Sequence, residues 1–198
     1  MSVYKRSHDN NIQDDIQSVA KKGDFKPTQK EVDQAISRPK KVTFNGVTWN
    51  GSEGRTPIWF KLDLKAFDDN GNPITGVRFM LHWRAPIVEG VDIVKLSFVM
   101  FFHDKRIYAL DPYPADNKPH RNRSIINHPD FVEVARGPHY HMYFEAAGEE
   151  IALKLDTDIS PDDFLGYWNY FCRALNITYE GQPPLPNQDK SGQLSWEM

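Results

Sequence analysis

An α+β fold is predicted by this sequence: a meander of antiparallel strands covered by a C-terminal helix, with a short helix before the strands. Between residues 41 and 156, apolar side chains recur mostly at every second position, which is typical of half-buried strands. Short connections separate these segments, so consecutive strands should be antiparallel neighbours, because parallel pairs need long crossovers. Between residues 160 and 176 the apolar side chains recur at helical spacing instead.

The chain of 198 residues is long enough for one domain with polar ends. Aromatic residues make up 13% of it, and their large rings bury much area per residue, so a sizeable core is expected. We predict a polar N-terminal segment over residues 1–26 and a single α+β domain over 27–179. A flexible tail should follow over 180–198, because this stretch is rich in proline and polar residues.

The elements of the domain can be placed in order along the chain. A helix should begin after Thr28, which can form a capping box with Glu31, and it should end before Pro39. The turn signal at residues 68–73 predicts a hairpin, and residues 103–105 predict a second tight turn. The predicted strands cover residues 42–44, 47–49, 58–64, 77–83, 93–102, 106–111, 137–146 and 151–155.

Residues 112–136 interrupt the strand pattern with several prolines and asparagines, so a long irregular loop is expected. Loops of this length within a compact domain often have a function. After the last strand, Ser160 should cap the closing helix, with Pro161 at its first position. The helix should cover the sheet with one apolar stripe, formed by Phe164, Trp168, Phe171 and Leu175.

Composition excludes several classes of protein. The formal net charge is −3 and the pI is about 6.2, with both signs mixed along the chain, which argues against a general nucleic-acid coat or a basic membrane clamp. The single cysteine, Cys172, cannot form an internal disulfide. The longest apolar run, residues 96–102, is too short to span a bilayer, and no secretory signal is visible. We therefore expect a cytoplasmic protein with no membrane partner.

A polar constellation around one predicted strand is the main candidate for function. In residues 137–145 the side chains alternate, with one apolar face and one polar face directed away from the core. The apolar face consists of Tyr140, Met142 and Phe144; the polar face consists of His139, His141, Tyr143 and Glu145. The preceding loop adds further polar residues, namely Asp111, His120, Arg121, Asn122, Arg123 and His128.

Several imidazoles beside arginine suit acid–base cleavage of a phosphodiester, with one ring as base, one as acid and arginine on the developing charge. We therefore predict catalytic roles for His120, His139, His141 and Glu145. Substrate contacts are predicted for Asp111, Arg121, Asn122, Arg123 and Tyr143. A polar outer strand face also needs no function at all, so a solvated surface is the alternative interpretation.

No cofactor is expected, although a divalent metal at His139, His141 and Glu145 is a second interpretation of the same residues. The spacing His-x-His-x-x-x-Glu matches the first half of the cupin metal signature. No histidine follows His141, so the ligand that the second half would supply is missing.

The stretches IYALDPYPADNKPHRN and GPHYHMYFE, with a helix ending in FCRALNI, resemble a family of uncharacterised bacterial domains. They are also similar to small toxins of bacterial toxin–antitoxin or phage-defence systems. The resemblance covers residues 107–178, and this chain has a longer insertion at 123–136. It implies a mobile-element or phage-defence setting but no particular reaction. The matching residues are Leu110, Asp111, His120, Asn122, Gly137, His139, His141, Tyr143 and Glu145.

Three functions therefore compete. The first is a toxin- or defence-type ribonuclease that uses the histidines. The second is a non-enzymatic protein-binding module or inhibitor, from a phage or a host regulatory system, that docks through its sheet surface and strand edges. The third is a metal-dependent small-molecule enzyme. The acidic pI weakens the first, but RNA could bind at local positive charges around the loop, namely Arg106, Lys118, Arg121, Arg123 and Arg136.

Overall fold

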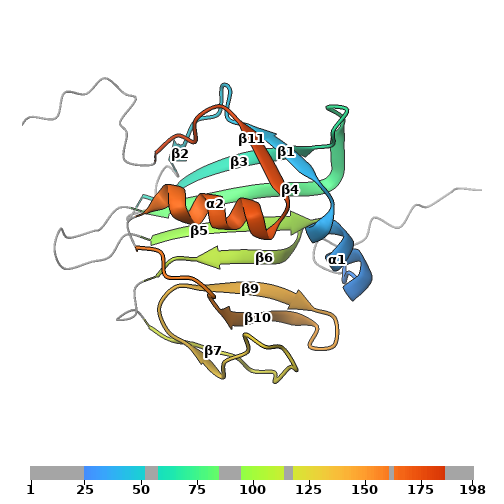
Figure 1. Cartoon of the computed structure of the whole chain (residues 1–198), viewed down its shortest axis with the longest axis vertical. Coiled ribbons are helices and arrows are strands. Elements are labelled where there is room, and N and C mark those ends of the chain that lie inside the picture. The colour runs from blue at the N-terminus through green and yellow to red at the C-terminus, as the bar shows by residue number, and fades with distance from the viewer. Residues whose placement is uncertain (1–24, 52–57, 85–94, 114–117, 161–162, 186–198) are drawn as a thin grey trace, which may run out of the picture.

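The computed structural model describes residues 25–51, 58–84, 95–113, 118–160 and 163–185. In these residues one large mixed sheet is crossed on one face by a C-terminal helix, and a short N-terminal helix lies at one end (Figure 1). The α+β class is as predicted, with a short N-terminal helix and a C-terminal helix that packs on the sheet. Most of the predicted 1–26 segment, and the tail from residue 186, lie outside the described residues.

The elements follow one another along the chain with short connections. In the described part, their bounds are α1 (Gln29–Ser37), β1 (Lys40–Thr43), β2 (Asn50–Gly51), β3 (Phe60–Phe67), β4 (Pro73–Arg84), β5 (Lys95–Phe102), β6 (Lys105–Asp111), β7 (His120–Arg121), β8 (Val134–Ala135), β9 (His139–Phe144), β10 (Glu149–Lys154), α2 (Phe164–Ala174) and β11 (Ile177–Glu180). The strands of the large sheet are ordered β10-β9-β6-β5-β4-β3-β1-β11, and β2 pairs with β3. Strands β7 and β8 form a separate pair within the long loop.

The predicted antiparallel meander is confirmed from β3 to β6. In the β3–β4 turn, the Asp68 carboxylate accepts the backbone N–H groups of Asn70 and Asn72 at 2.9 and 2.8 Å. Gly71 in the same turn has a φ of +80°, which glycine adopts without a steric penalty. After the long loop, β9 pairs with β6 and then with β10, again antiparallel.

The two helices are capped differently from each other. The predicted capping box of α1 is confirmed, because Thr28 accepts the N–H of Glu31 while Glu31 accepts the N–H of Thr28. For α2 the prediction of Ser160 as the cap is wrong. The helix begins later, at Phe164, and the Asp163 side chain accepts the N–H of Gly166 at 2.8 Å. Pro161 lies outside the described residues.

The core lies between α2 and the apolar face of the sheet, as predicted. All four residues of the expected stripe are buried, and Trp168 and Phe171 have no exposed surface. The ring of Phe98 on β5 lies 6.2 Å from that of Trp168 and 5.8 Å from that of Phe171, between ring centroids. Neither helix of the described residues is long and apolar enough to cross a membrane.

The sheet is mixed rather than wholly antiparallel because β11 follows α2 and pairs in parallel with β1. The predicted domain of residues 27–179 therefore ends with a strand and not with a helix. A parallel pair requires a long connection, and here all the elements between β1 and β11 form it. Lys40 fixes this arrangement. Its buried ammonium group donates hydrogen bonds to the carbonyl groups of Ile36, Arg38 and Leu175, at the C-terminal ends of both helices.

The segment after β11 packs on the domain instead of leaving it. Pro183 is buried, Leu185 packs against the core, and the Trp49 indole N–H donates to the carbonyl of Pro184 at 2.9 Å. The prediction of a flexible tail from residue 180 is therefore wrong for residues 180–185, and residues 186–198 lie outside the described residues. Composition alone misled the prediction, because Pro183 and Leu185 pack on the domain although the surrounding stretch is polar.

A candidate metal centre on the second face of the sheet

The two faces of strand β9 differ in character. One face is apolar and the other is polar. On the α2 side, Tyr140 stacks on Tyr108 of β6 with ring centroids 5.6 Å apart. His139 and His141 project from the opposite face, as the alternation predicts. The alternative interpretation of a solvated face is wrong for these two residues, since their exposed fractions are only 5% and 4%. The loop after β6 folds back over this face and brings a third histidine, His120 of β7, onto them.

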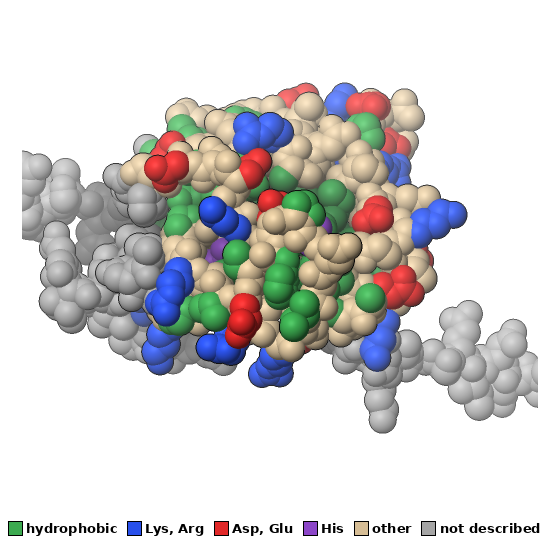
Figure 2. Space-filling view, turned by 60° about the horizontal axis from the view of Figure 1, so that its bottom comes forward, with side chains coloured by type: hydrophobic (Ala, Val, Ile, Leu, Met, Phe, Trp, Pro, Cys, Tyr) green, Lys and Arg blue, Asp and Glu red, His purple; other side chains and the backbone are tan. Residues whose placement is uncertain are grey.

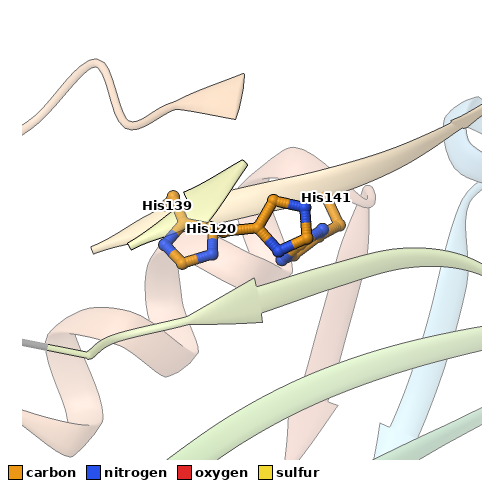
Figure 3. Close-up of side chains that lie close together, drawn as sticks. All are labelled: His120, His139 and His141. Carbon is orange, nitrogen blue, oxygen red and sulfur yellow. The ribbon is translucent and has the colours of Figure 1, made fainter. Parts of the chain in front are cut away.

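The three imidazoles converge on one point (Figure 3). Ring centroids are separated by 4.8 Å for His120 and His141 and by 4.9 Å for His139 and His141. The His120 and His139 centroids are 6.0 Å apart. One nitrogen of each ring can be chosen so that all three lie within 4.8 Å of one another. In the described residues no other group of three potential ligands meets this condition.

Asn122 holds the loop that carries His120. Its buried amide nitrogen donates to the carbonyl groups of Ala152 and Val132, both at 2.7 Å, and its amide oxygen accepts the N–H of Ala152 at 2.8 Å. This amide thus takes the place of a neighbouring strand at the edge of β10. Because these bonds occupy the side chain, we assign Asn122 to positioning of His120 and not to the substrate contact that the sequence suggested.

One ring nitrogen of each β9 histidine lies close to a fixed acceptor. His139 Nδ1 lies 2.7 Å from the carbonyl oxygen of Gly137, and His141 Nε2 lies 3.3 Å from Asp111 Oδ2. Ser97 donates to the other Asp111 oxygen at 2.6 Å. A ring N–H directed at an acceptor leaves the lone pair on the other nitrogen of that ring. Carbonyl and carboxylate acceptors of this kind orient metal-binding histidines.

The charges of the site favour neutral imidazoles. Burial lowers the pKa of His139, and the nearby His141 lowers it further. Burial also lowers the pKa of His120, with both other histidines adding to the effect. Burial alone would raise the pKa of Asp111, but hydrogen bonds from His141 and Ser97 outweigh it, so the net shift is downward. At neutral pH, His120 and His139 are uncharged and Asp111 is ionised, which is the state that binds a cation.

The spacing is close to that of a metal-bound set. Tetrahedral coordination with metal–nitrogen bonds of about 2.0–2.1 Å places ligand nitrogens about 3.3 Å apart. Nitrogens within 4.8 Å of one another reach that spacing with side-chain movements of about 1 Å. His120 is the residue best able to move, since it lies on a two-residue strand at the surface. Three imidazoles also leave a fourth position for water, as in catalytic zinc sites.

Glu145 does not join the three histidines. It is exposed, beyond the end of β9, and its carboxylate accepts the N–H of Gln29 at the start of α1 at 2.7 Å. The cupin-like set of His139, His141 and Glu145 is therefore not assembled. His120 is the third group instead. No short sequence motif links His120 to His139 and His141.

The remaining predicted residues divide between core and surface. Tyr143 has an exposed fraction of 1%, and the Lys105 ammonium lies 5.1 Å from its ring centroid, so the phenol is not open to a substrate. Arg121 is bound to Glu133 at 2.8 Å on the exposed β7–β8 pair. Arg123 is exposed in the same loop. Asp111 lies behind His141 and orients it.

Ser97 is a site residue that the sequence analysis missed. It is buried on β5, on the same face as the histidines, and its hydroxyl binds Asp111. The signal was present, because Ser97 is the lone hydroxyl in the apolar strand 96–102.

Figure 2 shows parts of histidine side chains at the bottom of a hollow, beside a Lys or Arg side chain.

No family model, curated protein or solved structure matches the chain. The resemblance to toxin-like domains therefore stays a prediction.

Proposed function

We propose that this protein is a metal-dependent hydrolase in which His120, His139 and His141 hold one divalent transition-metal ion. The observation that carries the proposal is the convergence of His120 with two buried imidazoles, each of which has one ring nitrogen close to a fixed acceptor. Imidazole ligands without thiolates suit Zn²⁺ and related ions such as Co²⁺, Fe²⁺ and Ni²⁺.

Such an ion would lower the pKa of a bound water so that hydroxide is available near neutral pH. The protein contributes the geometry. Strand β9 fixes two ligands, Asn122 positions the loop that supplies the third, and Asp111 with Ser97 orients His141. This proposal departs from the expectation of no cofactor and keeps the predicted importance of the three histidines.

The predicted metal-free ribonuclease uses the same residues as acid and base. It is less well supported, because the rings of His139 and His141 are buried and therefore poorly placed to exchange protons with solvent. Only His120 is placed to exchange protons with solvent. Chelation separates the two mechanisms, since acid–base histidines need no ion.

Equilibrium dialysis against Zn²⁺ or Co²⁺, followed by elemental analysis, tests the proposal. The wild-type chain should bind one equivalent, and His139→Asn or His141→Asn should lose it. His128→Asn is the matched control, because His128 is a loop histidine that contacts Asp130 and Phe144 and lies outside the cluster. Equal metal content in the wild type and the His139→Asn and His141→Asn variants would overturn the proposal.

The binding-module alternative has support at one sheet edge. The β10 edge is occupied by Asn122 and by the backbone of Asp130, which accepts the N–H of Lys154. In the described residues, β11 pairs only with β1, so its outer edge can receive a strand from a partner. The backbone N–H of Tyr179 is directed away from β1, so a Tyr179→Pro variant that abolished the biological effect, while the histidine variants kept it, would favour this alternative.

A further inference from the structure

Arg106 and Glu150 form an ion pair beside the three histidines. Arg106 lies on β6 and Glu150 on β10, and these strands flank β9, so their side chains meet over the strand that carries His139 and His141. The Arg106 Nε atom donates to Glu150 Oε2 at 2.5 Å. The Glu150 side chain is 13% exposed and that of Arg106 is 43% exposed. A largely buried carboxylate thus holds a guanidinium that still faces solvent.

The pair belongs electrostatically to the histidine site. Burial is the main cause that lowers the pKa of His120, and the positive charge of Arg106 contributes in the same direction. Burial raises the pKa of Glu150, while the charges of Arg106 and His141 oppose that rise. Charges act on one another in this way only over short distances at the protein surface. Geometry gives the same placement, because Glu150 lies opposite Tyr143, two residues from His141 on β9, and holds the guanidinium at this end of the cluster.

The guanidinium of Arg106 has N–H donors beyond the one that Glu150 uses, and these can bind a ligand. A guanidinium has five N–H donors in a planar fork. Glu150 engages Nε, and no described residue accepts from either terminal nitrogen. Each terminal nitrogen retains two N–H groups, and this fork matches the paired oxygens of phosphate or carboxylate.

We propose that Arg106, oriented by Glu150, binds the anionic group of the substrate, and that this group is a phosphodiester. The inference deepens the proposed function and depends on it for the reacting water. Asp111 and Glu150 neutralise two of the three positive charges that a divalent ion and Arg106 bring. With the ammonium group of Lys105 also close to Glu150, the site keeps a net positive charge, which suits the anionic group of a phosphodiester.

The reaction would be hydrolysis at phosphorus. The oxygen of the activated water forms a bond to phosphorus, and the bond to the leaving oxygen breaks with its electron pair. The leaving oxygen takes up the proton that the water released. Negative charge spreads over the outer phosphate oxygens in the transition state, where a fixed guanidinium is most effective.

The experiment uses inorganic phosphate as the probe, titrated calorimetrically into the full chain with and without bound Co²⁺. Arg106→Gln should weaken phosphate binding at least tenfold and leave metal content unchanged. Arg78→Gln is the matched control. Arg78 lies on β4, two strands farther from β9 than Arg106. Its side chain is 38% exposed and forms an ion pair with Asp104. This control should bind phosphate as the wild type does.

Each result separates the two proposals. Phosphate binding that is equal in Arg106→Gln and wild type, or absent from both, would overturn the role of Arg106. Acetate binding that is tighter than phosphate binding and equally dependent on Arg106 would overturn the phosphodiester class. A wild type that binds no metal, yet binds phosphate through Arg106, would refute the metal-dependent hydrolase and leave the anion site standing.

Discussion

Asn122→Ala should disrupt both the fold and the site, because one side chain joins the His120 loop to the edge of β10. The change removes three hydrogen bonds and leaves the N–H and C=O of Ala152 and the C=O of Val132 without their partner. A buried group left unpaired costs about 1–3 kcal/mol, but at a sheet edge water can replace part of this. We expect a total loss of about 2–4 kcal/mol in the free energy of unfolding.

For a domain of this size each kcal/mol lowers the melting temperature by about 2–4 °C, so a decrease of about 5–15 °C is expected. The measurement is thermal unfolding of the metal-free protein, followed by a Co²⁺ titration below the transition. Metal affinity should fall, because the loop no longer fixes His120. Asn127→Ala, in an exposed part of the same loop, is the control and should change neither quantity. A variant at Asn122 with wild-type stability and metal affinity would refute the positioning role.

The other predictions address the core, the C-terminal segment, the pH dependence and the biological effect. Trp168→Ala should cost about 3–5 kcal/mol, because the ring has no exposed surface and contacts several other rings; an unchanged melting temperature would contradict this packing. Truncation after Gly181 should lower the melting temperature, since Pro183 to Leu185 pack on the domain, and an unchanged value would restore the flexible-tail interpretation. The folded-state pKa of His139 lies below its ordinary 6.5, so below that pH the unfolded state binds more protons. The free energy of unfolding of the metal-free protein should therefore rise with pH up to about 6.5. The slope of this free energy against pH should be smaller in His139→Asn, and equal slopes in the variant and the wild type would argue against a buried neutral imidazole at His139. If the protein acts as a toxin, growth inhibition should disappear in the His139→Asn, His141→Asn double variant, and persistent inhibition would separate toxicity from the site.

Much of the fold could be predicted because its signals are local. The capping box at Thr28, the turn after Asp68 and the alternation of β9 each lie within a few residues of sequence. The pairing of β11 with β1 could not be predicted in this way. It joins residues about as far apart as the domain allows, and no short pattern indicates parallel pairing.

The site was predictable only in part, for a related reason. Strand alternation places His139 and His141 on one face, but it does not show whether that face is covered. The cover depends on the path of the loop, which Asn122 fixes through a contact to Ala152, 30 residues away. Spacing also suggested Glu145, whereas tertiary structure places that carboxylate at α1 and brings His120 in its place.

The central claim is that the three histidines together bind one metal ion, and X-ray absorption spectroscopy of the Zn²⁺-loaded protein tests it most directly. The result expected is a shell of three imidazole nitrogens and one oxygen at about 2.0–2.1 Å. His120→Asn should reduce the imidazole count to two, and His128→Asn should leave it at three. A spectrum dominated by oxygen ligands, or one unchanged by His120→Asn, would contradict the claim.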